Sequence, residues 1–326
     1  MRIDLMAHLG EYILSSDPEW LEAKHKANLF NPWFTPGFIE LAAKNIAEQF
    51  LKKEKLTNWT SSFSIKKVQP KRVGIVMAGN IPLVGFHDLL SVFISGHKAA
   101  IKPSSKDEIL INQLVKKLKE MNSEINQLIS FEAMLKSCDA YIATGSNNSA
   151  RYFEYYFSKY PSIIRRNRTS VAILDGSETN EDLEKLADDV HLYFGMGCRN
   201  VTKIFVPKDY DFVKLLDVFK KYQYFKDHHK YKNNYDYNLA LHILNGKFYM
   251  TNESIILFEN SSLFSPISQL NYEFYSDKNS VIQKLRISDE LQCVVGHGHI
   301  PFGQAQNPSL TDYADDINTL NFLTNL

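Results

Sequence analysis

The chain has 326 residues, of which 44% are hydrophobic and 23% charged, the balance of a soluble globular protein rather than of a disordered one. Lysine plus arginine equals aspartate plus glutamate, at 37 each, so the charge gives no reason to expect nucleic acid or an anionic membrane as partner. No apolar run approaches the roughly 20 residues of a membrane-spanning helix. Three widely separated cysteines predict neither a disulfide framework nor a zinc cluster, so we expect a cytoplasmic protein.

The first 60 residues predict helices. Apolar residues recur at helical spacing on both sides of a breaker segment at residues 31–37. Within that segment, Thr35 followed by Pro36 is a typical helix start. We therefore expect an N-terminal helical segment over residues 1–66.

From Arg72 onward, short apolar strands alternate with helices. The run Val73 to Ala78 predicts a buried strand that stops at Gly79-Asn80, and the apolar stretch after it predicts a helix that begins at Pro82 and ends at Gly96. This alternation predicts βαβ units and a parallel sheet, which binds ligands beyond the carboxyl ends of its strands. Further strands are predicted at residues 99–101, 140–143 and 170–174, and helices at 106–121 and from about 149.

The second half of the chain repeats this alternation. We predict a helix over 181–194, a tight turn over 195–198, a strand over 203–207 and a helix over 208–224. Residues 226–238, rich in Lys, His, Tyr and Asn, read as a polar surface insertion.

The turn Gly195-Met196-Gly197-Cys198 is the most informative motif. Two glycines let the backbone turn tightly, which leaves the cysteine side chain accessible to a substrate. Nearby backbone N–H groups could stabilise a thiolate and a tetrahedral oxyanion, and a cysteine thioester remains reactive. The alternative is an ordinary turn that carries a small buried residue. For Cys138 and Cys293, which lie beside apolar strand-like runs, we favour a role in the core.

Three other turns follow predicted strands. The amide of Asn80 could donate to a carbonyl oxygen as charge develops on it, although Gly-Asn and Pro are common in plain turns. Lys102, followed by Ser104, could contact a cofactor ribose or its 2′-phosphate, or could be a surface lysine. Thr144, Gly145 and Ser146 open a helix, where free N–H groups could hold a pyrophosphate, yet the same residues form ordinary helix caps.

The order of these turns resembles the aldehyde dehydrogenase superfamily, most closely its LuxC-type acyl-CoA reductases. Residues 79–83 are similar to the superfamily's Trp-Asn-Phe-Pro segment, which makes Asn80 the oxyanion-hole amide. Cys198 matches the catalytic cysteine. The remaining matches are Gly96 to Ser104 (Gly-Asn-x-Val-x-Lys-Pro-Ser, with Lys102 as the ribose contact), Ala143 to Ser146 with Arg151 (the turn over the cofactor phosphates) and Ile300 to Gln304 (Pro-Phe-Gly-Gly, with Phe302 near the cofactor).

The resemblance implies an α/β fold of two doubly wound domains. The expected parts are the helical segment 1–66, an NAD(P)-binding Rossmann-like domain over 67–190, a catalytic domain over 191–290, and a segment over 291–326 that returns to the cofactor domain or an oligomer interface. It also implies a homodimer or a higher homo-oligomer.

Two departures from the superfamily's pattern bear on the reaction. Aldehyde-oxidising members carry a Glu-Leu-Gly-Gly-Lys segment, whose glutamate activates water. Here residues 165–169 read Arg-Arg-Asn-Arg-Thr, and without that base water attack on an acyl-enzyme should be slow. The Glu-Ile-Phe-Gly-Pro segment, whose glutamate holds the nicotinamide ribose, is replaced by Ser262 to Pro266. These departures favour reduction of an acyl-CoA, with NADPH as the expected cofactor and NADH as an alternative.

Other interpretations stay open at this stage. The enzyme could reduce an acyl phosphate, oxidise aldehydes with a base from elsewhere in the chain, or be a non-catalytic nucleotide-binding scaffold. Arg165, Arg166 and Arg168 could contact phosphates of CoA or of the cofactor, or form a solvated basic run. His297 and His299 share one face if they lie in a strand, but no third ligand is evident, so we predict no metal site.

Overall fold

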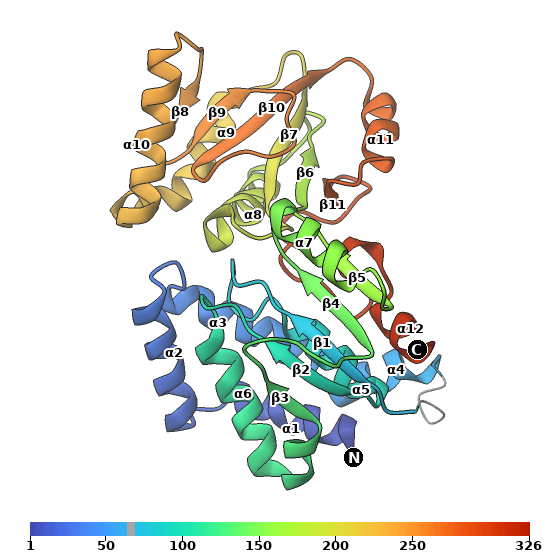
Figure 1. Ribbon diagram of the computed structural model, residues 1–326. Coiled ribbons are helices and arrows are strands. Elements are labelled where there is room, and N and C mark those ends of the chain that lie inside the picture. The colour runs from blue at the N-terminus through green and yellow to red at the C-terminus, as the bar shows by residue number, and fades with distance from the viewer. Residues whose placement is uncertain (64–68) are drawn as a thin grey trace. The chain divides into compact units, whose positions relative to one another are not determined.

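The computed structural model describes residues 1–63 and 69–326, and Figure 1 draws its elements. The chain forms two compact units. Unit 1 comprises Met1–Asn167 with Pro308–Leu326, and unit 2 comprises Arg168–Asn307. We expected the cofactor domain to extend to residue 190, but strand pairing ends unit 1 earlier: β5 (Ser162–Arg165) pairs with β4, whereas β6 (Thr169–Ile173) pairs with β7 and β11. The expected boundary at residue 66 lies outside the described residues.

Unit 1 contains a five-stranded parallel sheet in the order β3-β2-β1-β4-β5. Its central strand, β1 (Arg72–Val76), pairs with β2 (Lys98–Lys102) on one side and β4 (Ala140–Thr144) on the other. The edge strand β3 (Ile129–Phe131) pairs with β2. The chain moves outward from β1 to β3 and then returns to β4, so β1 and β4 flank the switch point at which such sheets bind ligands. The strands predicted at 73–78, 99–101 and 140–143 are confirmed.

One face of this sheet packs into a core that also contains the N-terminal helices and the C-terminal segment. Thr35 caps α3 by accepting a hydrogen bond from the N–H of Phe38, as predicted. Trp59 donates from Nε1 to the hydroxyl of Tyr313 at 2.8 Å, which ties the C-terminal segment to this core. The helices of this side are α1 (Arg2–Ile13), α2 (Pro18–Phe30), α3 (Pro36–Asn45), the π-helical turn η1 (Ile46–Phe50), α4 (Lys53–Ser61), α5 (Phe86–Ser95), α6 (Glu108–Met121), the 3₁₀ turns η3 (Ser123–Gln127) and η6 (Ala314–Asp316), and α12 (Thr319–Thr324).

The other face of the sheet packs on α7 (Asn147–Phe157), which follows β4. Tyr141 on β4 stacks on Phe157 with ring centroids 3.9 Å apart. Cys138 is buried in the same small cluster. Its predicted role in the core is therefore confirmed.

The helix predicted from Pro82 instead begins at Phe86. Leu83 has a left-handed backbone with φ of 56°, which interrupts a right-handed helix. Its N–H donates to Oδ2 of Asp107 at 2.6 Å. The residues between β1 and α5 therefore form a loop, and the prediction that Pro82 opens a helix N-terminus is wrong.

Unit 2 contains a six-stranded sheet in the order β11-β6-β7-β10-β9-β8, in which only β8 is antiparallel to its neighbour. Residues 226–238, expected as a surface insertion, lie mostly in α10, where Tyr231 and Asn238 are buried. The strands are β7 (Val201–Pro207), β8 (Met250–Thr251), β9 (Ile256–Glu259), β10 (Gln269–Tyr275) and β11 (Leu291–Gly296), and the helices are α8 (Asn180–His191), η4 (Leu192–Gly195), α9 (Phe212–Val218), η5 (Phe219–Asp227), α10 (His229–Leu244) and α11 (Lys278–Arg286). Among the described residues, no helix combines the length and apolar character needed to cross a membrane.

A buried ion pair joins three elements of unit 1. Arg165, at the end of β5, donates from one guanidinium nitrogen to both carboxylate oxygens of Asp88 on α5, at 2.7 and 2.6 Å. Its second terminal nitrogen donates to the hydroxyl of Thr319 at 2.9 Å. Arg165 and Asp88 are only 4% and 5% exposed, so the interpretation of Arg165 as a phosphate contact or a solvated residue is wrong.

The two remaining arginines of this run differ in environment. Arg166 is exposed and pairs with Glu154. Arg168 donates to the carbonyl of Leu291 at 2.9 Å within unit 2.

Replacing Arg165 by methionine should destabilise the protein by about 3–5 kcal/mol, because it leaves the Asp88 carboxylate buried without a counter-charge. Combining Arg165→Met with Asp88→Leu should restore most of that loss, since no charge is then buried. The matched surface variant Arg166→Met should change stability by less than about 1 kcal/mol. Urea unfolding checks all three, and equal losses in the single and double variants would contradict the buried-pair account.

Candidate active site

Cys198 lies in the turn between η4 and β7 of unit 2, and its side chain is partly exposed. Ser170 on β6 donates from its hydroxyl to the Cys198 carbonyl at 3.1 Å. The three residues from Tyr193 to Gly195 have φ of 55°, 56° and 74°. Left-handed conformations cost roughly 1–2 kcal/mol at each non-glycine residue, so other interactions must hold this turn.

Asn200 supplies those interactions. Its side chain is fully buried, and its Oδ1 accepts the N–H of Gly197 at 2.8 Å. Its Nδ2 donates to the carbonyls of Leu192 and Asp189, at 2.8 and 3.0 Å. Both ends of the amide therefore connect the last turn of α8 to the turn that carries Cys198. Asn200 is not among the predicted site residues, although an asparagine closing a Gly-x-Gly turn is a recognisable turn signal.

The same end of α8 holds the Phe302 segment. The fully buried carboxylate of Asp189 accepts the N–H groups of Gly303 and Ala305, at 2.6 and 3.0 Å. Burial raises the pKa of Asp189 to about 7, against the opposing effect of these two donors. Phe302 is buried and meets the ring of His297 edge-on, with centroids 5.5 Å apart. Unit 2 thus brings the Cys198 turn and the predicted Phe302 segment to one helix end, and the contact of Phe302 with a cofactor remains a prediction.

A second loop of unit 2, Ser262 to Pro266, replaces the superfamily's acidic segment. The Thr202 hydroxyl donates to the carbonyl of Leu263 at 2.7 Å. The side-chain amide of Asn271 donates to the carbonyl of Phe264 at 2.9 Å. The fully buried Lys203 donates to the carbonyl of Ser261 at 2.8 Å. This loop is therefore fixed through its backbone by neighbouring strands and presents no acidic side chain.

The other predicted site residues lie in unit 1, at the carboxyl ends of its central strands. Because β1, β2 and β4 are adjacent and parallel, the turns after them share one edge of the sheet. A Cβ on Gly79 would lie 2.5 Å from the hydroxyl oxygen of Ser104, so glycine allows two of these turns to touch. Asn80, Lys102 and Ser146 are exposed, and Ser104, Thr144 and Gly145 are partly exposed.

Asp107 lies beneath the Asn80 loop. Its N–H donates to the Ser104 carbonyl at 3.0 Å, while its Oδ2 accepts the N–H of Leu83. Its Oδ1 is buried and has no hydrogen-bond partner among the described residues. Burial raises the pKa of Asp107 to about 8, with the Leu83 N–H acting in the opposite direction. Asp107 directly precedes α6, but its side chain does not cap that helix and instead bonds to the loop after β1.

The third turn joins β4 to α7. Ser146 caps α7 by accepting the N–H of Ser149 at 3.3 Å. A Cβ on Gly145 would lie 2.9 Å from atoms of both Phe153 and Ser149. Glycine therefore lets the strand end lie against the helix, and the exposed first turn of α7 stays accessible to an anion.

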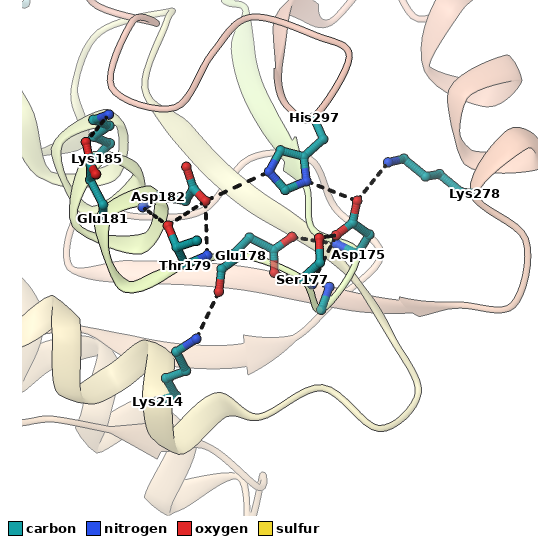
Figure 2. A network of polar contacts seen from close by, with 11 residues as sticks. Asp175, Ser177, Glu178, Thr179, Glu181, Asp182, Lys185, Lys214, Lys278 and His297 are labelled. Atoms are coloured by element: carbon teal, nitrogen blue, oxygen red, sulfur yellow. Dashed lines mark hydrogen bonds and ion pairs between the residues drawn. The ribbon is translucent and has the colours of Figure 1, made fainter.

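His297 lies in the turn after β11, not in a strand with His299. Figure 2 shows its ring between the carboxylates of Asp175 and Asp182, at 3.2 and 3.9 Å. Ligand atoms of Asp175, Glu178 and His297 lie within 4.8 Å of one another, a spacing that could hold a metal ion. The Glu178 carboxylate already accepts the N–H groups of Asp175 and Gly176, at 2.6 and 3.1 Å. Asp175 also faces Lys278 at 3.4 Å. These contacts account for the cluster as a polar network that ties the end of β6 to the turn before Phe302.

A family model, "Acyl-CoA reductase (LuxC)", matches residues 39–218, a stretch that contains Asn80, Lys102 and Cys198. No curated protein sequence matches significantly.

Solved structures of aldehyde dehydrogenases are similar in fold. Aldehyde dehydrogenase 21 from Physcomitrella patens, in complex with the reaction product succinate, has a TM-score of 0.69 at 9% identity, covering 99% of this chain and 83% of that one. The Mycobacterium tuberculosis enzyme complexed with NAD+ has a TM-score of 0.66 at 13% identity, covering 90% and 72%. The NAD-dependent enzyme from Sinorhizobium meliloti has a TM-score of 0.66 at 11% identity, covering 90% and 69%. The expected aldehyde dehydrogenase-like fold is confirmed.

Replacing Asn200 by alanine should destabilise the protein by roughly 2–4 kcal/mol, because several buried backbone groups lose their partner at once. The same change at the partly exposed Asn234, whose side chain donates to one carbonyl within α10, should stay within about 0.5 kcal/mol. Urea unfolding measures both. A loss at Asn200 no larger than at Asn234 would show that the amide does not hold the turn.

Asp107 should make stability depend on pH. Its pKa is about 8 in the folded protein against an ordinary value of 3.8, so between these values the folded state binds a proton that the unfolded state has lost. Its contribution to stability is therefore complete below pH 3.8 and is lost as pH rises toward 8. The free energy of unfolding of the parent protein should fall, relative to Asp107→Asn, by up to about 1.4 kcal/mol per pH unit. Unfolding at pH 5, 6.5 and 8 measures this difference, and parallel pH profiles would contradict it.

Proposed function

Because the chain belongs to the LuxC family of acyl-CoA reductases, and so is an oxidoreductase of acyl groups or aldehydes, we propose that it reduces an acyl-CoA thioester to an aldehyde. The reaction proceeds through an acyl thioester on Cys198 and uses a nicotinamide cofactor. One observation carries the proposal: Cys198 is a partly exposed thiol on a turn that the buried Asn200 holds in place. A cysteine that served only as a core residue would need no such support.

Cys198 acts as the nucleophile. Its thiolate attacks the acyl carbon, a new sulfur–carbon bond forms, and the bond to the CoA sulfur breaks, so that CoA leaves as a thiolate. The first intermediate is tetrahedral and carries negative charge on oxygen. A backbone N–H at the Cys198 turn and the amide of Asn80 are the proposed donors to that oxygen.

The turns of unit 1 have the chemistry that a nicotinamide dinucleotide needs. The sheet order places the ends of β1 and β4 at a switch point, where dinucleotides bind. Ser146 at the start of α7 can receive the pyrophosphate, and Lys102 with Ser104 can bind the ribose. When bound, the cofactor supplies the hydride that reduces the acyl carbon to the aldehyde level, after which the thiohemiacetal releases aldehyde and regenerates the Cys198 thiolate. Two of the aldehyde dehydrogenase structures that are similar in fold to this chain are complexes with NAD+.

NADPH is the proposed form of the cofactor. Lys102 and Lys106 are both exposed at the end of β2, where a 2′-phosphate would find cations. The first carboxylate after this strand, Asp107, is buried and bonded to Leu83, so it does not compete for the ribose hydroxyls.

Reduction is favoured over oxidation because the segment that would supply a general base has none. Arg165 occupies its start and is buried against Asp88, and the next four residues contain no carboxylate. Without such a base, water competes poorly with hydride for the acyl-enzyme.

Replacing Cys198 by alanine should abolish aldehyde formation, with a loss of at least about a thousandfold in rate, because no other group replaces the nucleophile. Oxidation of NADPH with acyl-CoAs of increasing length measures the rate, and intact mass measures acylation of the protein. Cys138→Ala, in the core of unit 1, is the matched control and should retain both. Undiminished turnover in Cys198→Ala would refute the proposal.

The same assay separates the alternative reactions. An acyl phosphate reductase would oxidise NADPH only with acyl phosphates, and an aldehyde oxidiser would form acid from aldehyde and NAD+. A non-catalytic scaffold would do neither, and its Cys198 would react with iodoacetamide only at high pH.

A further inference from the structure

A small cavity lies inside unit 2 beside the turn that carries Cys198. Its volume is about 20 Å³. Residues on both sides of Cys198 in the chain line it, namely Phe194, Gly195, Val201 and Thr202, together with part of the loop at residues 265–269 and His191 at the end of α8.

His191 presents a hydrogen-bond acceptor to which none of the described residues donates. Its Nδ1 lies 2.8 Å from the carbonyl oxygen of Ala187, and because a carbonyl only accepts, Nδ1 must carry the proton. Nε2 is then an unprotonated acceptor on the opposite side of the ring, away from the helix backbone. The side chain is 2% exposed, and no described residue donates to Nε2.

The surroundings keep this imidazole neutral and rigid. Its ring stacks on Tyr222, with centroids 4.6 Å apart and planes 2° from parallel, and meets Phe219 edge-on. Burial lowers the pKa of His191 to about 4. Near neutral pH, Nε2 therefore stays unprotonated and still needs a hydrogen-bond donor.

Several other polar groups around the cavity are engaged. Thr202 donates to the Leu263 carbonyl, and Oε1 of Gln269 lies 2.8 Å from Nε2 of His242. A buried acceptor nearly always has a donor. A space of this volume holds a single group the size of a water molecule, so the occupant that the site requires is one O–H group.

We propose that this cavity is a subsite for a hydroxyl group of the acyl substrate, whose O–H donates to Nε2 of His191. The inference rests on the proposed function, since that function places the acyl group at the turn that forms one wall of the cavity. With an unsubstituted acyl chain, the cavity keeps a water molecule. A substrate hydroxyl of matching position replaces this water and reproduces its hydrogen bond, whereas a methyl group does not.

The kinetic test compares butyryl-CoA with 2-hydroxy-, 3-hydroxy- and 4-hydroxybutyryl-CoA. At least one hydroxylated substrate should have a kcat/KM roughly tenfold above that of butyryl-CoA, the gain expected when one ordered water is released and its hydrogen bond is reproduced. His191→Phe should remove that preference and leave the kcat/KM for butyryl-CoA within about threefold, which also shows that the variant folds. Equal rates for all four substrates, or a preference that survives His191→Phe, would overturn the subsite.

A second readout does not depend on turnover. In Cys198→Ala protein labelled with ¹⁵N-histidine, the Nε2 signal of His191 is the one that His191→Phe removes. It should shift with the preferred hydroxybutyryl-CoA and not with butyryl-CoA. If this shift is observed but the parent protein reduces no acyl-CoA, the subsite stands and the proposed function fails. A signal that none of the four compounds moves would mean a structural water only, and would overturn the subsite even if acyl-CoA reduction is observed.

Discussion

The side-chain amide of Asn200 has no contact with solvent, so its donor and acceptor groups must all find partners within unit 2. It finds them only when the left-handed residues that follow α8 fold back and bring Gly197 against the helix end. The cost of that backbone is thereby offset by buried hydrogen bonds. The position of Cys198 is a consequence, because the thiol belongs to the turn that the amide closes.

Much of the candidate chemistry of unit 2 converges on the same turn of α8. The carbonyl of Asp189 accepts a hydrogen bond from the Asn200 amide, and its carboxylate accepts the N–H groups on either side of Gln304. His191 lies two residues further along the chain. One rigid helix end therefore aligns the nucleophile turn, the Phe302 segment and the cavity. Since buried polar groups tolerate little displacement, a change at Asp189 should be felt by both the Cys198 turn and the Phe302 segment.

The sequence is sufficient to predict features that are local or periodic. Alternating strands and helices predict the parallel sheets, and the Gly-x-Gly turn singles out Cys198. What it does not show is burial. Asn200 and Asp107 look like ordinary turn and cap residues until tertiary contacts enclose them, and the helix expected from Pro82 is displaced because Leu83 bonds to an aspartate 24 residues away. Residues 226–238 are predicted as a surface insertion for the same reason, because the sequence does not show that Tyr231 and Asn238 are buried.

The two segments that lack their expected carboxylates have each acquired a structural role. Arg165 is engaged by Asp88 and Thr319 in the core of unit 1, and a glutamate there would place a second negative charge beside Asp88, which burial and like-charge repulsion both oppose. The loop at 262–266 is held through its backbone by Thr202 and Asn271, so its conformation needs no acidic side chain. The absence of a carboxylate at residue 165 is therefore built into the packing of unit 1, and a single substitution toward glutamate there would damage the fold.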